Sequence, residues 1–443
     1  MIIMKFGGTS VGNADRIRNV ANIVKSNIKK KPVVVVSAVA KITDALIKLA
    51  NEAGVGKGDE VLENIETIHF EILKKLGINK ELLEKDFDEL KKLADETTSL
   101  RNFGSQLTAK ISDHFQSFGE RMSSKITAAQ LNKIGVTANA FNAWEIGFLT
   151  DSEFGNAEPL EIAYTNIKNS IKKLDAVPVI TGFIGKTEDG EITTLGRGGS
   201  DYTAAVVGAA VNANEIQIWT DVSGILSADP KVVSSAKTIP KVSFAEASEL
   251  AYFGARVLHP KTILPAMQRN IPVRVLNSFA PENKGTIILN KPGKSKQTVK
   301  SIAYTKNITL INIESTRMLG AYGFLAGIFD IFDEYRKSVD VVATSEVSVT
   351  LTIDNEQNIE RILRELKEIA NVTVSRNKAI ICIVGESMRK TPGIAGRTFS
   401  ALGKNKVNIE MISQGASEIN ITFIVDGKDT EKAVKVLHKE FFD

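Results

Sequence analysis

The chain has 443 residues, too many for one hydrophobic core, so two or three domains are expected. Hydrophobic residues make up 43% and charged residues 24%, which are the proportions of a soluble globular protein. Lys and Arg number 56 and Asp and Glu 52, and this net charge of +4 is spread along the chain, which argues against a nucleic-acid-binding surface.

Membrane, metal and disulfide chemistry also find no support in the sequence. No apolar stretch reaches the roughly 20 residues of a membrane-spanning helix, and the start, Met1 to Lys5, runs into a glycine turn and predicts a strand rather than a signal peptide. The only cysteine, Cys382, sits in an alternating apolar run and is predicted to be a core residue, and the 4 histidines show no metal-ligand spacing. The cytoplasm is the predicted compartment.

The first element is a buried strand, Ile2 to Phe6, followed by Gly7-Gly8 and a helix from about residue 15 to 29. A glycine turn between a strand and a helix suits phosphate binding, although neither the Walker A pattern nor the dinucleotide-binding pattern is present. Lys5 needs a partner inside an apolar strand, and a phosphate would be one. The alternative is a lysine whose ammonium extends to solvent at a strand end.

A second buried strand, residues 32–36, ends at Ser37, and a helix begins at about Thr43. Residues 58–131 are mostly helical by their apolar spacing. Residues 117–121 are predicted to interrupt and restart that helix, which leaves two interpretations of Glu120. It is either a ligand for an ammonium group or an acidic residue at a helix N-terminus.

Further strands are predicted at 136–141, 176–183, 215–219, 271–276 and 285–289, and they alternate with helices. This order indicates a mostly parallel α/β sheet, in which functional loops gather at the carboxyl ends of the strands. The polar or glycine-containing strand ends are Lys5 to Gly8, Ser37, Thr181-Gly182 and Thr220-Asp221.

The segment from Thr193 to Tyr202 holds three glycines within four positions and opens a helix of small residues. Backbone N–H groups at a helix start favour an anion, Arg197 offers a planar fork for a carboxylate or phosphate, and Asp201 is an acid at the helix start. A tight turn with an N-cap explains the same features.

The polar segment 290–297 is the predicted domain boundary, and the tail beyond it contains an internal repeat. Residues 308–315 and 380–387 are alternating strands, and each is followed by a glycine-started helix, a second strand pair and a second helix. The order β-α-β-β-α predicts two ferredoxin-like units of about 70 residues, each a four-stranded sheet backed by helices. Residues 318–325 and 338–346 are either structural or part of a small-molecule sensor.

Four motifs in this order resemble aspartate kinase. They are Lys5-Phe6-Gly7-Gly8-Thr9-Ser10-Val11, Thr194 to Ala204, Thr220-Asp221-Val222 with Ala228-Asp229-Pro230, and Phe253-Gly254-Ala255 with Val257-Leu258-His259-Pro260. The resemblance covers the whole chain and implies the α/β/α sandwich of the amino-acid kinases at residues 1–292, with a helical insert at about 58–119. It also implies two ACT-like regulatory units, at 300–372 and 373–443.

The resemblance implies ATP-dependent phosphorylation of the side-chain carboxylate of L-aspartate to 4-phospho-L-aspartate, the first step toward lysine, threonine and methionine. Lys5 would bridge the transferring phosphoryl group, Gly7 and Gly8 would give backbone donors, and Asp201 would orient Lys5. Arg197 would hold the α-carboxylate of aspartate and Glu120 its ammonium, with Ser37, Thr43 and Ser200 completing the pocket. Mg²⁺ would be bound through the ATP phosphates, without a protein site of its own.

By the same resemblance, the nucleotide would lie near Phe6, Thr220, Asp221 and the loop from Gly224 to Lys231. Leu226 stands where a tyrosine is common, Lys231 where arginine is common, and Arg256 where lysine is usual. The latter two keep the charge but change the hydrogen-bond geometry. Lys41 and Asp44 also depart from the usual residues. None of these departures removes a residue with a chemical role, so an active enzyme is predicted.

The tail resembles the monofunctional, lysine-sensitive type, which favours lysine over threonine as the effector. The residues implied at the effector site are Met318, Ala321, Phe324, Leu325, Ser338, Val339, Asp340, Thr344, Ser345 and Glu346. Asp340 and Glu346 suit the ammonium groups of lysine. The tail units are expected to pair between subunits, which would give a homodimer or homotetramer.

Two rival hypotheses stay open. One is a kinase of the same fold acting on another small acid, and Arg197 with Glu120 argues against it because the pair suits an α-amino acid. The other is a non-catalytic amino-acid sensor with a decayed kinase domain, and the presence of Lys5, Arg197 and Asp201 argues against that.

Overall fold

The structure is a computed structural model that describes residues 1–53, 58–102, 106–254, 258, 260–293, 297–318, 322–415 and 419–443. The chain divides into two compact units. The first comprises residues 1–225, 240–244 and 257–292, and the second comprises 226–239, 245–256 and 293–443. Segments 226–239 and 245–256 therefore group with the tail, although the sequence assigned them to the catalytic region. The domain boundaries drawn from the sequence stay a proposal.

The first unit is built on an eight-stranded sheet in the order β3-β4-β2-β1-β7-β9-β10-β8. All neighbouring strands are parallel except β9 and β10, so the predicted mostly parallel α/β sheet is confirmed. A separate two-stranded hairpin, β5–β6, lies outside this sheet. The strands are β1 Ile2–Phe6, β2 Pro32–Val36, β3 Ala138–Phe141, β4 Val177–Thr181, β5 Ile184–Lys186, β6 Ile192–Thr194, β7 Glu215–Thr220, β8 Lys241–Ser243, β9 Val273–Asn277 and β10 Thr286–Leu289.

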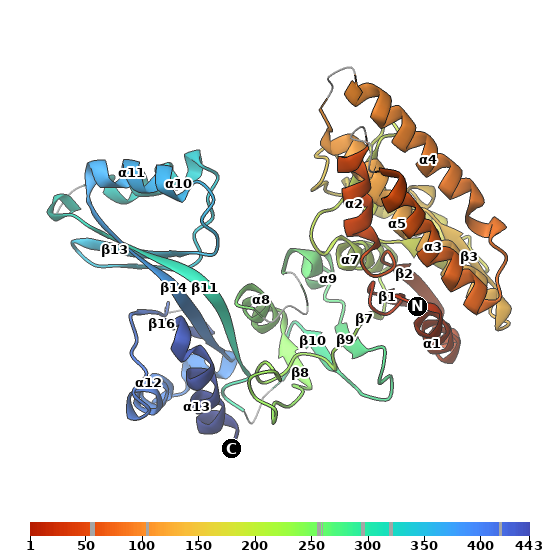
Figure 1. The fold of residues 1–443 in the computed structure, drawn as a ribbon. Helices are drawn as coiled ribbons and strands as arrows, with labels where there is room; N and C mark the ends of the chain where they lie inside the picture. The colour runs from red at the N-terminus through yellow and green to blue at the C-terminus, as the bar shows by residue number, and fades with distance from the viewer. Residues whose placement is uncertain are drawn as a thin grey trace. The chain divides into compact units, whose positions relative to one another are not determined.

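Helices cover both faces of this sheet, which gives the three-layer sandwich seen in Figure 1. One face is covered by α1 Ala14–Ser26, α2 Ile42–Glu52, α3 Gly58–Leu76, α4 Glu81–Asn102 and α5 Ala109–Lys133. The other carries α6 Glu161–Ile171, α7 Gly199–Val211 and α9 Leu264–Gln268. Short 3₁₀ turns are η1 Ile28–Lys30, η2 Ala143–Ile146 and η3 Pro260–Ile263.

The apolar runs of the sequence explain these layers. Alternate residues of a strand face opposite sides of its sheet, and Met4 and Phe6 join the core cluster of α1 to α5. Ile3, the residue before Met4, faces α7, where Gly208 lets the helix approach the sheet. A Cβ on Gly208 would lie 2.6 Å from Ile216, so a larger residue would push α7 away from β1 and β7.

The second unit is built on a six-stranded antiparallel sheet in the order β12-β13-β11-β14-β16-β15. Its strands are β11 Ser301–Glu314, β12 Val342–Thr344, β13 Ser348–Ile353, β14 Asn371–Val384, β15 Met411–Ser413 and β16 Asn420–Asp426. Its helices are α8 Phe244–Tyr252, of which Phe244 belongs to the first unit, α10 Phe324–Glu334, α11 Ile359–Ile369, α12 Ile394–Lys404 and α13 Thr430–Phe442, with turns η4 Thr316–Met318, η5 Glu386–Lys390 and η6 Gly427–Asp429.

The two predicted four-stranded sheets are present, but they are joined through shared strands. The first uses residues 308–314 of β11 and 371–375 of β14, with β12 and β13. The second uses 378–384 of β14 with β15, β16 and residues 301–306 of β11. Its fourth strand therefore comes from the chain before the first repeat. The sequence missed this strand because its partner is distant in the chain.

Each half of this sheet has its own core. α10 and α11 pack on Ile311 and Leu351, and α12 and α13 pack on Ile381 and Phe423. The two repeats even begin their first helices alike, because Gly323 and Gly393 adopt φ of 81° and 84° as N-caps. Cys382 is fully buried beside Thr422, as a core residue.

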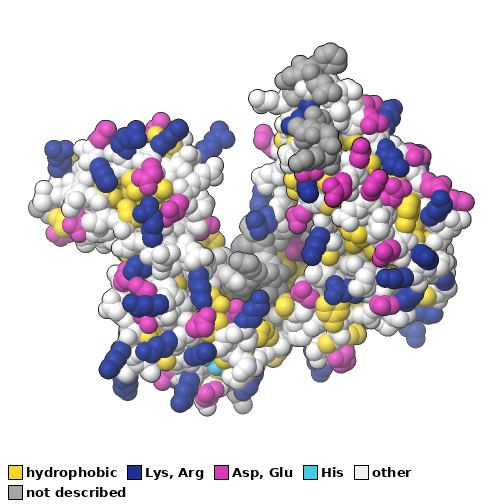
Figure 2. Space-filling model, in the orientation of Figure 1, with side chains coloured by type: hydrophobic (Ala, Val, Ile, Leu, Met, Phe, Trp, Pro, Cys, Tyr) yellow, Lys and Arg dark blue, Asp and Glu magenta, His cyan; other side chains and the backbone are white. Residues whose placement is uncertain are grey.

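The surfaces of both units carry interspersed charges of both signs, and Figure 2 shows no extended field of Lys and Arg on the face in view. Within the described ranges, no helix combines the length and apolar character needed to cross a bilayer.

Candidate active site

Lys5 is the second-last residue of β1, and its ammonium forms an ion pair. Its Nζ lies 2.6 Å from Asp201 Oδ1, and the two side chains are only 12% and 13% exposed. Asp201 lies in the first turn of α7, on the opposite side of the site from the α5 helix. The alternative that the Lys5 ammonium extends into solvent is therefore wrong. The Asp201 carboxylate instead orients the partly buried Lys5 side chain, whose ammonium can also bind an anion.

The glycines of the Thr193–Tyr202 segment meet two structural demands. Gly196 and Gly198 have φ of 71° and 73°, a conformation that side chains disfavour. A Cβ on Gly199 would lie 2.7 Å from the ring of Phe183. The segment is thus both a tight turn and a helix start, with Gly198 as the N-cap of α7. Arg197 projects from this turn and is exposed.

Glu120 lies in the middle of α5, so the predicted break at residues 117–121 is wrong. Gly119 is not a helix breaker here. A Cβ at this position would lie 2.7 Å from Ala38 Cβ, and the glycine allows α5 to contact the turn after β2. Glu120 is also not an acidic residue at a helix N-terminus, because it lies in the fourth turn of α5.

The carboxyl group of Glu120 is 2% exposed and only half satisfied. Its Oε1 accepts the Ala38 N–H at 3.0 Å, while no hydrogen bond to Oε2 is found among the described residues. Burial raises the pKa of Glu120 to about 8, against the lowering effects of the backbone hydrogen bonds and of the Lys5 charge. An unpaired buried oxygen is costly, so this one is poised for a ligand that donates a proton or brings a positive charge.

Asp113 is a second buried acid on α5 that the sequence reasoning missed. It is 1% exposed and accepts three hydrogen bonds. Its Oδ2 accepts the N–H groups of Gly155 and Thr194 at 2.8 Å each, and its Oδ1 accepts the Thr194 hydroxyl at 2.8 Å. Asp113 therefore ties the end of β6, just before Arg197, to the helix that carries Glu120. The spacing of seven residues between the two acids, which puts them on one helix face, was the available signal.

The other predicted aspartate ligands surround these groups. Ser37 follows β2 and is half-buried, and its N–H donates to Phe6 O at 3.1 Å. Thr43 is half-buried in the first turn of α2. Ser200 is 7% exposed in the first turn of α7, and Gly182 allows it to pack against the end of β4. All of these positions lie at strand ends or in helix first turns, as the sheet topology predicts.

The glycine turn after β1 departs from the expectation in one detail. The Gly7 N–H donates to Trp219 O at 3.1 Å, so it is engaged within the sheet edge. Gly8 comes so close to the turn after β2 that a Cβ would lie 2.9 Å from Ala38 O. Phe6 is fully buried and stacks on Trp219, with ring centroids 5.9 Å apart, so only its backbone faces the turn.

Comparison with known proteins places this geometry in a family. Residues 1–277 match the amino acid kinase family and residues 381–441 match an ACT domain. The whole chain is 38% identical to lysine-sensitive aspartokinase 3 of Escherichia coli, of which it covers 99%, and 41% identical to chloroplastic aspartokinase 2 of Arabidopsis thaliana, of which it covers 84%. The chain belongs to the aspartokinases of the amino acid kinase family.

Solved aspartokinase structures agree with this assignment. The structure of Escherichia coli aspartokinase III in complex with aspartate and ADP matches with a TM-score of 0.85 and 36% identity, over all of both chains. The structure of the same enzyme with lysine and aspartate matches with a TM-score of 0.83.

The predicted nucleotide-contacting residues fall in several parts of the chain. Thr220 ends β7, with its hydroxyl 3.2 Å from Asp221 Oδ1, and Asp221 is exposed. Leu226 and Lys231 belong to the second unit, where Lys231 N–H donates to Asp229 Oδ1 at 2.9 Å. Arg256 lies outside the described residues. The nucleotide part of the predicted site therefore stays a prediction.

The predicted effector residues lie in the first repeat of the second unit. Met318, Phe324 and Leu325 lie around the start of α10, Ser338 and Val339 follow that helix, Thr344 ends β12, and Ser345 and Glu346 turn into β13. Ala321 lies outside the described residues.

Asp340 is the most perturbed acid of this group. Burial, followed by the charge of Asp354, raises its pKa to about 6. Its Oδ1 accepts the Tyr252 hydroxyl of α8 at 3.3 Å, and no hydrogen bond to its Oδ2 is found among the described residues. Like Glu120, Asp340 thus holds a buried oxygen that suits an ammonium group. Glu346, in contrast, is exposed.

Proposed function

We propose that the chain phosphorylates the side-chain carboxylate of L-aspartate with ATP, giving 4-phospho-L-aspartate and ADP. The observation that carries this assignment is the ion pair of Lys5 and Asp201 beside the half-satisfied buried carboxyl of Glu120. β1, which carries Lys5, is the parallel neighbour of β2, and Ala38 after β2 holds Glu120, so the cation and the carboxyl group lie at the same edge of the sheet. A cation for the phosphoryl group and an acceptor for an ammonium are the two requirements of an amino-acid kinase.

Aspartate would be held at both ends of its backbone. Glu120 Oε2 would accept the substrate ammonium, and Arg197 would pair with the α-carboxylate. Asp113 would hold Arg197 and Glu120 at a fixed separation, since it joins the end of β6, near Arg197, to α5, which carries Glu120. Ser37, Thr43 and Ser200 would close the pocket around the side-chain carboxylate, which is the nucleophile.

The transfer itself needs alignment and charge neutralisation more than covalent help. An oxygen of the substrate carboxylate attacks the γ-phosphorus of ATP, and the bond to the β,γ-bridging oxygen breaks. Lys5, held by Asp201, would stabilise the negative charge on the transferring group. The Gly8 backbone would lie against the phosphates, in a turn that leaves no room for a Cβ. Mg²⁺ on the ATP phosphates would neutralise part of their charge.

The nucleotide would extend from Phe6 and Gly7 toward Thr220 and Asp221. The position of Thr220 supports this, because β7 is the neighbour of β1 and both strands end at the same edge of the sheet. Gly7 would donate to a phosphate only after its N–H leaves Trp219 O, to which it is hydrogen-bonded in the structure.

A hydroxamate assay with MgATP and aspartate tests the assignment. We expect acyl phosphate to be trapped with aspartate and far less with glutamate. Lys5→Ala should abolish turnover while the fold is kept, and Lys48→Ala, an exposed residue of α2, is the matched control. Near-normal turnover by Lys5→Ala would contradict the role of Lys5. Absence of acyl phosphate under all conditions would instead favour the non-catalytic sensor, and a preference for another acid would favour the other rival.

We also propose that the second unit binds L-lysine as a feedback inhibitor, with Asp340 accepting one of its ammonium groups. The unpaired Asp340 Oδ2 supports this role. Titration of the kinase reaction with L-lysine and L-threonine should show inhibition by lysine, and Asp340→Asn should lose it. Inhibition by threonine alone would contradict the proposal.

A homodimer or homotetramer through the second unit is the proposed assembly. Four large apolar side chains of its first repeat are exposed, Tyr322, Leu325, Phe329 and Val347, and exposed apolar groups of this size favour association. Light scattering on the purified chain should give at least a dimer, and a monomer would contradict it. The compartment also stays a prediction, the cytoplasm, because the relatives include chloroplastic enzymes.

A further inference from the structure

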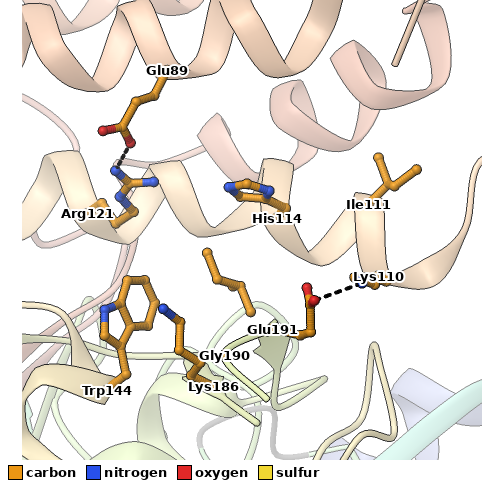
Figure 3. Close-up of a pocket in the computed structure, with 10 residues that line it drawn as sticks. Glu89, Lys110, Ile111, His114, Arg121, Trp144, Lys186, Gly190 and Glu191 are labelled. Atoms are coloured by element: carbon orange, nitrogen blue, oxygen red, sulfur yellow. Dashed lines mark hydrogen bonds and ion pairs between the residues drawn. The ribbon is translucent and has the colours of Figure 1, made fainter. Parts of the chain in front are cut away.

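A pocket of about 380 Å³ lies in the first unit between α5 and the β5–β6 hairpin (Figure 3). We call it the hairpin pocket. Its walls include Ile111 and His114 of α5, Trp144 of η2, Lys186 of β5 and Ile192 of β6. Its volume falls in the range of roughly 300–1,000 Å³ that small-ligand pockets occupy.

The hairpin pocket is separate from the aspartate site. α5 turns about 100° per residue, so Asp113 and Glu120 point one way while His114 and Arg121, each one residue later, point to the adjacent face. Glu120 contacts the turn after β2, whereas Arg121 and His114 border the pocket in Figure 3. The same helix thus serves two sites on neighbouring faces.

The charges around the pocket leave one cation uncompensated. Arg121 pairs with Asp86 and Glu89, and Lys110 pairs with Glu191 at 3.0 Å. The Lys186 ammonium lies 5.0 Å from the centre of the Trp144 ring and has no carboxylate at ion-pair distance in the described part of the chain. Burial and the charge of Arg121 lower the pKa of His114, so its imidazole is neutral and adds no charge.

The remaining surface of the pocket is apolar and aromatic. The Ile111 and Ile192 side chains and the indole of Trp144 line it together, and the His114 ring is held against Phe118 by stacking. One free positive charge beside an indole face suits a single negative charge on a flat or branched apolar body. A phosphate or a dicarboxylate would lack a second free cation, and a cationic ligand would find both carboxylates already paired.

We propose that the hairpin pocket binds small organic monocarboxylates, with the carboxylate on Lys186 and the apolar body between Trp144 and Ile192. Such a ligand would contact both α5 and the hairpin, the two elements that the hydrogen bonds of Asp113 also join. The binding itself does not depend on the kinase activity, and its test uses no turnover.

Benzoate and benzamide are a matched pair of probes, because they share their shape and differ in charge. We expect benzoate, titrated into the full chain by isothermal calorimetry with saturating aspartate present, to bind at least about 10-fold more tightly than benzamide, as loss of a charge-assisted contact predicts. Saturating aspartate keeps benzoate away from Arg197. Lys186→Gln should lower benzoate affinity about 10-fold, and Lys168→Gln, an exposed lysine of α6, should leave it unchanged.

A second variant guards against a misfolded Lys186→Gln protein. Trp144→Ala should also weaken benzoate binding, while both variants should keep the thermal unfolding midpoint of the native chain within a few degrees. No benzoate binding by the native chain would overturn the proposal. So would equal binding of benzamide, or benzoate binding unchanged by Lys186→Gln.

Discussion

The two buried acids of α5 face the same side of one helix and differ in how they are satisfied. Asp113 accepts three hydrogen bonds from β6 and the loop at Gly155, whereas Glu120 accepts one bond from the backbone of another element and keeps Oε2 without one among the described residues. A satisfied buried carboxylate fixes structure. An unsatisfied one lowers stability and is retained where a ligand uses it. The contrast predicts that Asp113 is a positioning residue and that Glu120 is a binding residue on the same helix.

The largest expected effect is on folding, from Asp113→Asn. Asparagine keeps one acceptor oxygen, replaces the other with an amide nitrogen that cannot accept a hydrogen bond, and removes the negative charge that all three donors face. We therefore expect the free energy of unfolding to fall by about 3 kcal/mol. The same isosteric change at Glu120, Glu120→Gln, should cost less than about 0.5 kcal/mol because it removes the penalty of a desolvated carboxyl. Urea denaturation of both variants measures the difference. An equal loss in the free energy of unfolding for both variants would contradict the distinction between a structural Asp113 and a ligand-binding Glu120.

The second effect is on substrate binding, where we expect the substitution of Glu120 to have a larger effect than that of Asp113. Glu120→Gln replaces a charged acceptor of the substrate ammonium by a neutral one, so the KM for aspartate should rise about 10- to 100-fold. The KM for ATP should change little. Steady-state kinetics at saturating concentrations of the other substrate give both values. A rise confined to ATP would place Glu120 at the nucleotide instead.

The third effect is the pH dependence of that KM. Below pH 8 the raised pKa of Glu120 keeps its carboxyl protonated, and the substrate ammonium must displace that proton to bind. The KM for aspartate should therefore fall about 10-fold between pH 7 and pH 9 in the native chain. In Glu120→Gln it should be flat. A parallel slope in both proteins would assign the titration to another group.

The smallest effect sharpens the account of Asp113. Thr194→Val removes the hydroxyl that donates to Asp113 Oδ1 and leaves the backbone donors of Thr194 and Gly155 in place. We expect a loss of about 1 kcal/mol in the free energy of unfolding. The result of urea denaturation should lie between the native chain and Asp113→Asn. A cost as large as that of Asp113→Asn would mean that the hydroxyl, rather than the backbone, holds the hairpin.

The sequence predicted those parts of the site that local patterns determine. Lys5 at the end of an apolar strand and the glycines before Asp201 are such patterns, and the order of strands and helices gave the parallel sheet. Gly119 was misread as a helix break because its reason is a contact with Ala38, far away in the chain. Asp113 was missed for the same cause, since its partners lie 42 and 81 residues away.

The tail also shows that contacts between distant parts of the chain were not predictable from local patterns. The internal repeat predicted the order of elements, and the matching N-cap glycines Gly323 and Gly393 confirm it. The shared sheet escaped prediction because residues 301–306 complete the second repeat from in front of the first. Local periodicity carries no information about which distant strand will be the partner.

The central claim, that Glu120 receives the ammonium of aspartate, is tested most directly by the protons released on binding. Isothermal titration of aspartate into the native chain at pH 7, repeated in two buffers of different ionisation enthalpy, measures that number. A carboxyl with a pKa of about 8 that becomes ionised on binding predicts a release of about one proton per aspartate, and Glu120→Gln should release none. Aspartate binding without proton release by the native chain, or equal release by the variant, would contradict the account.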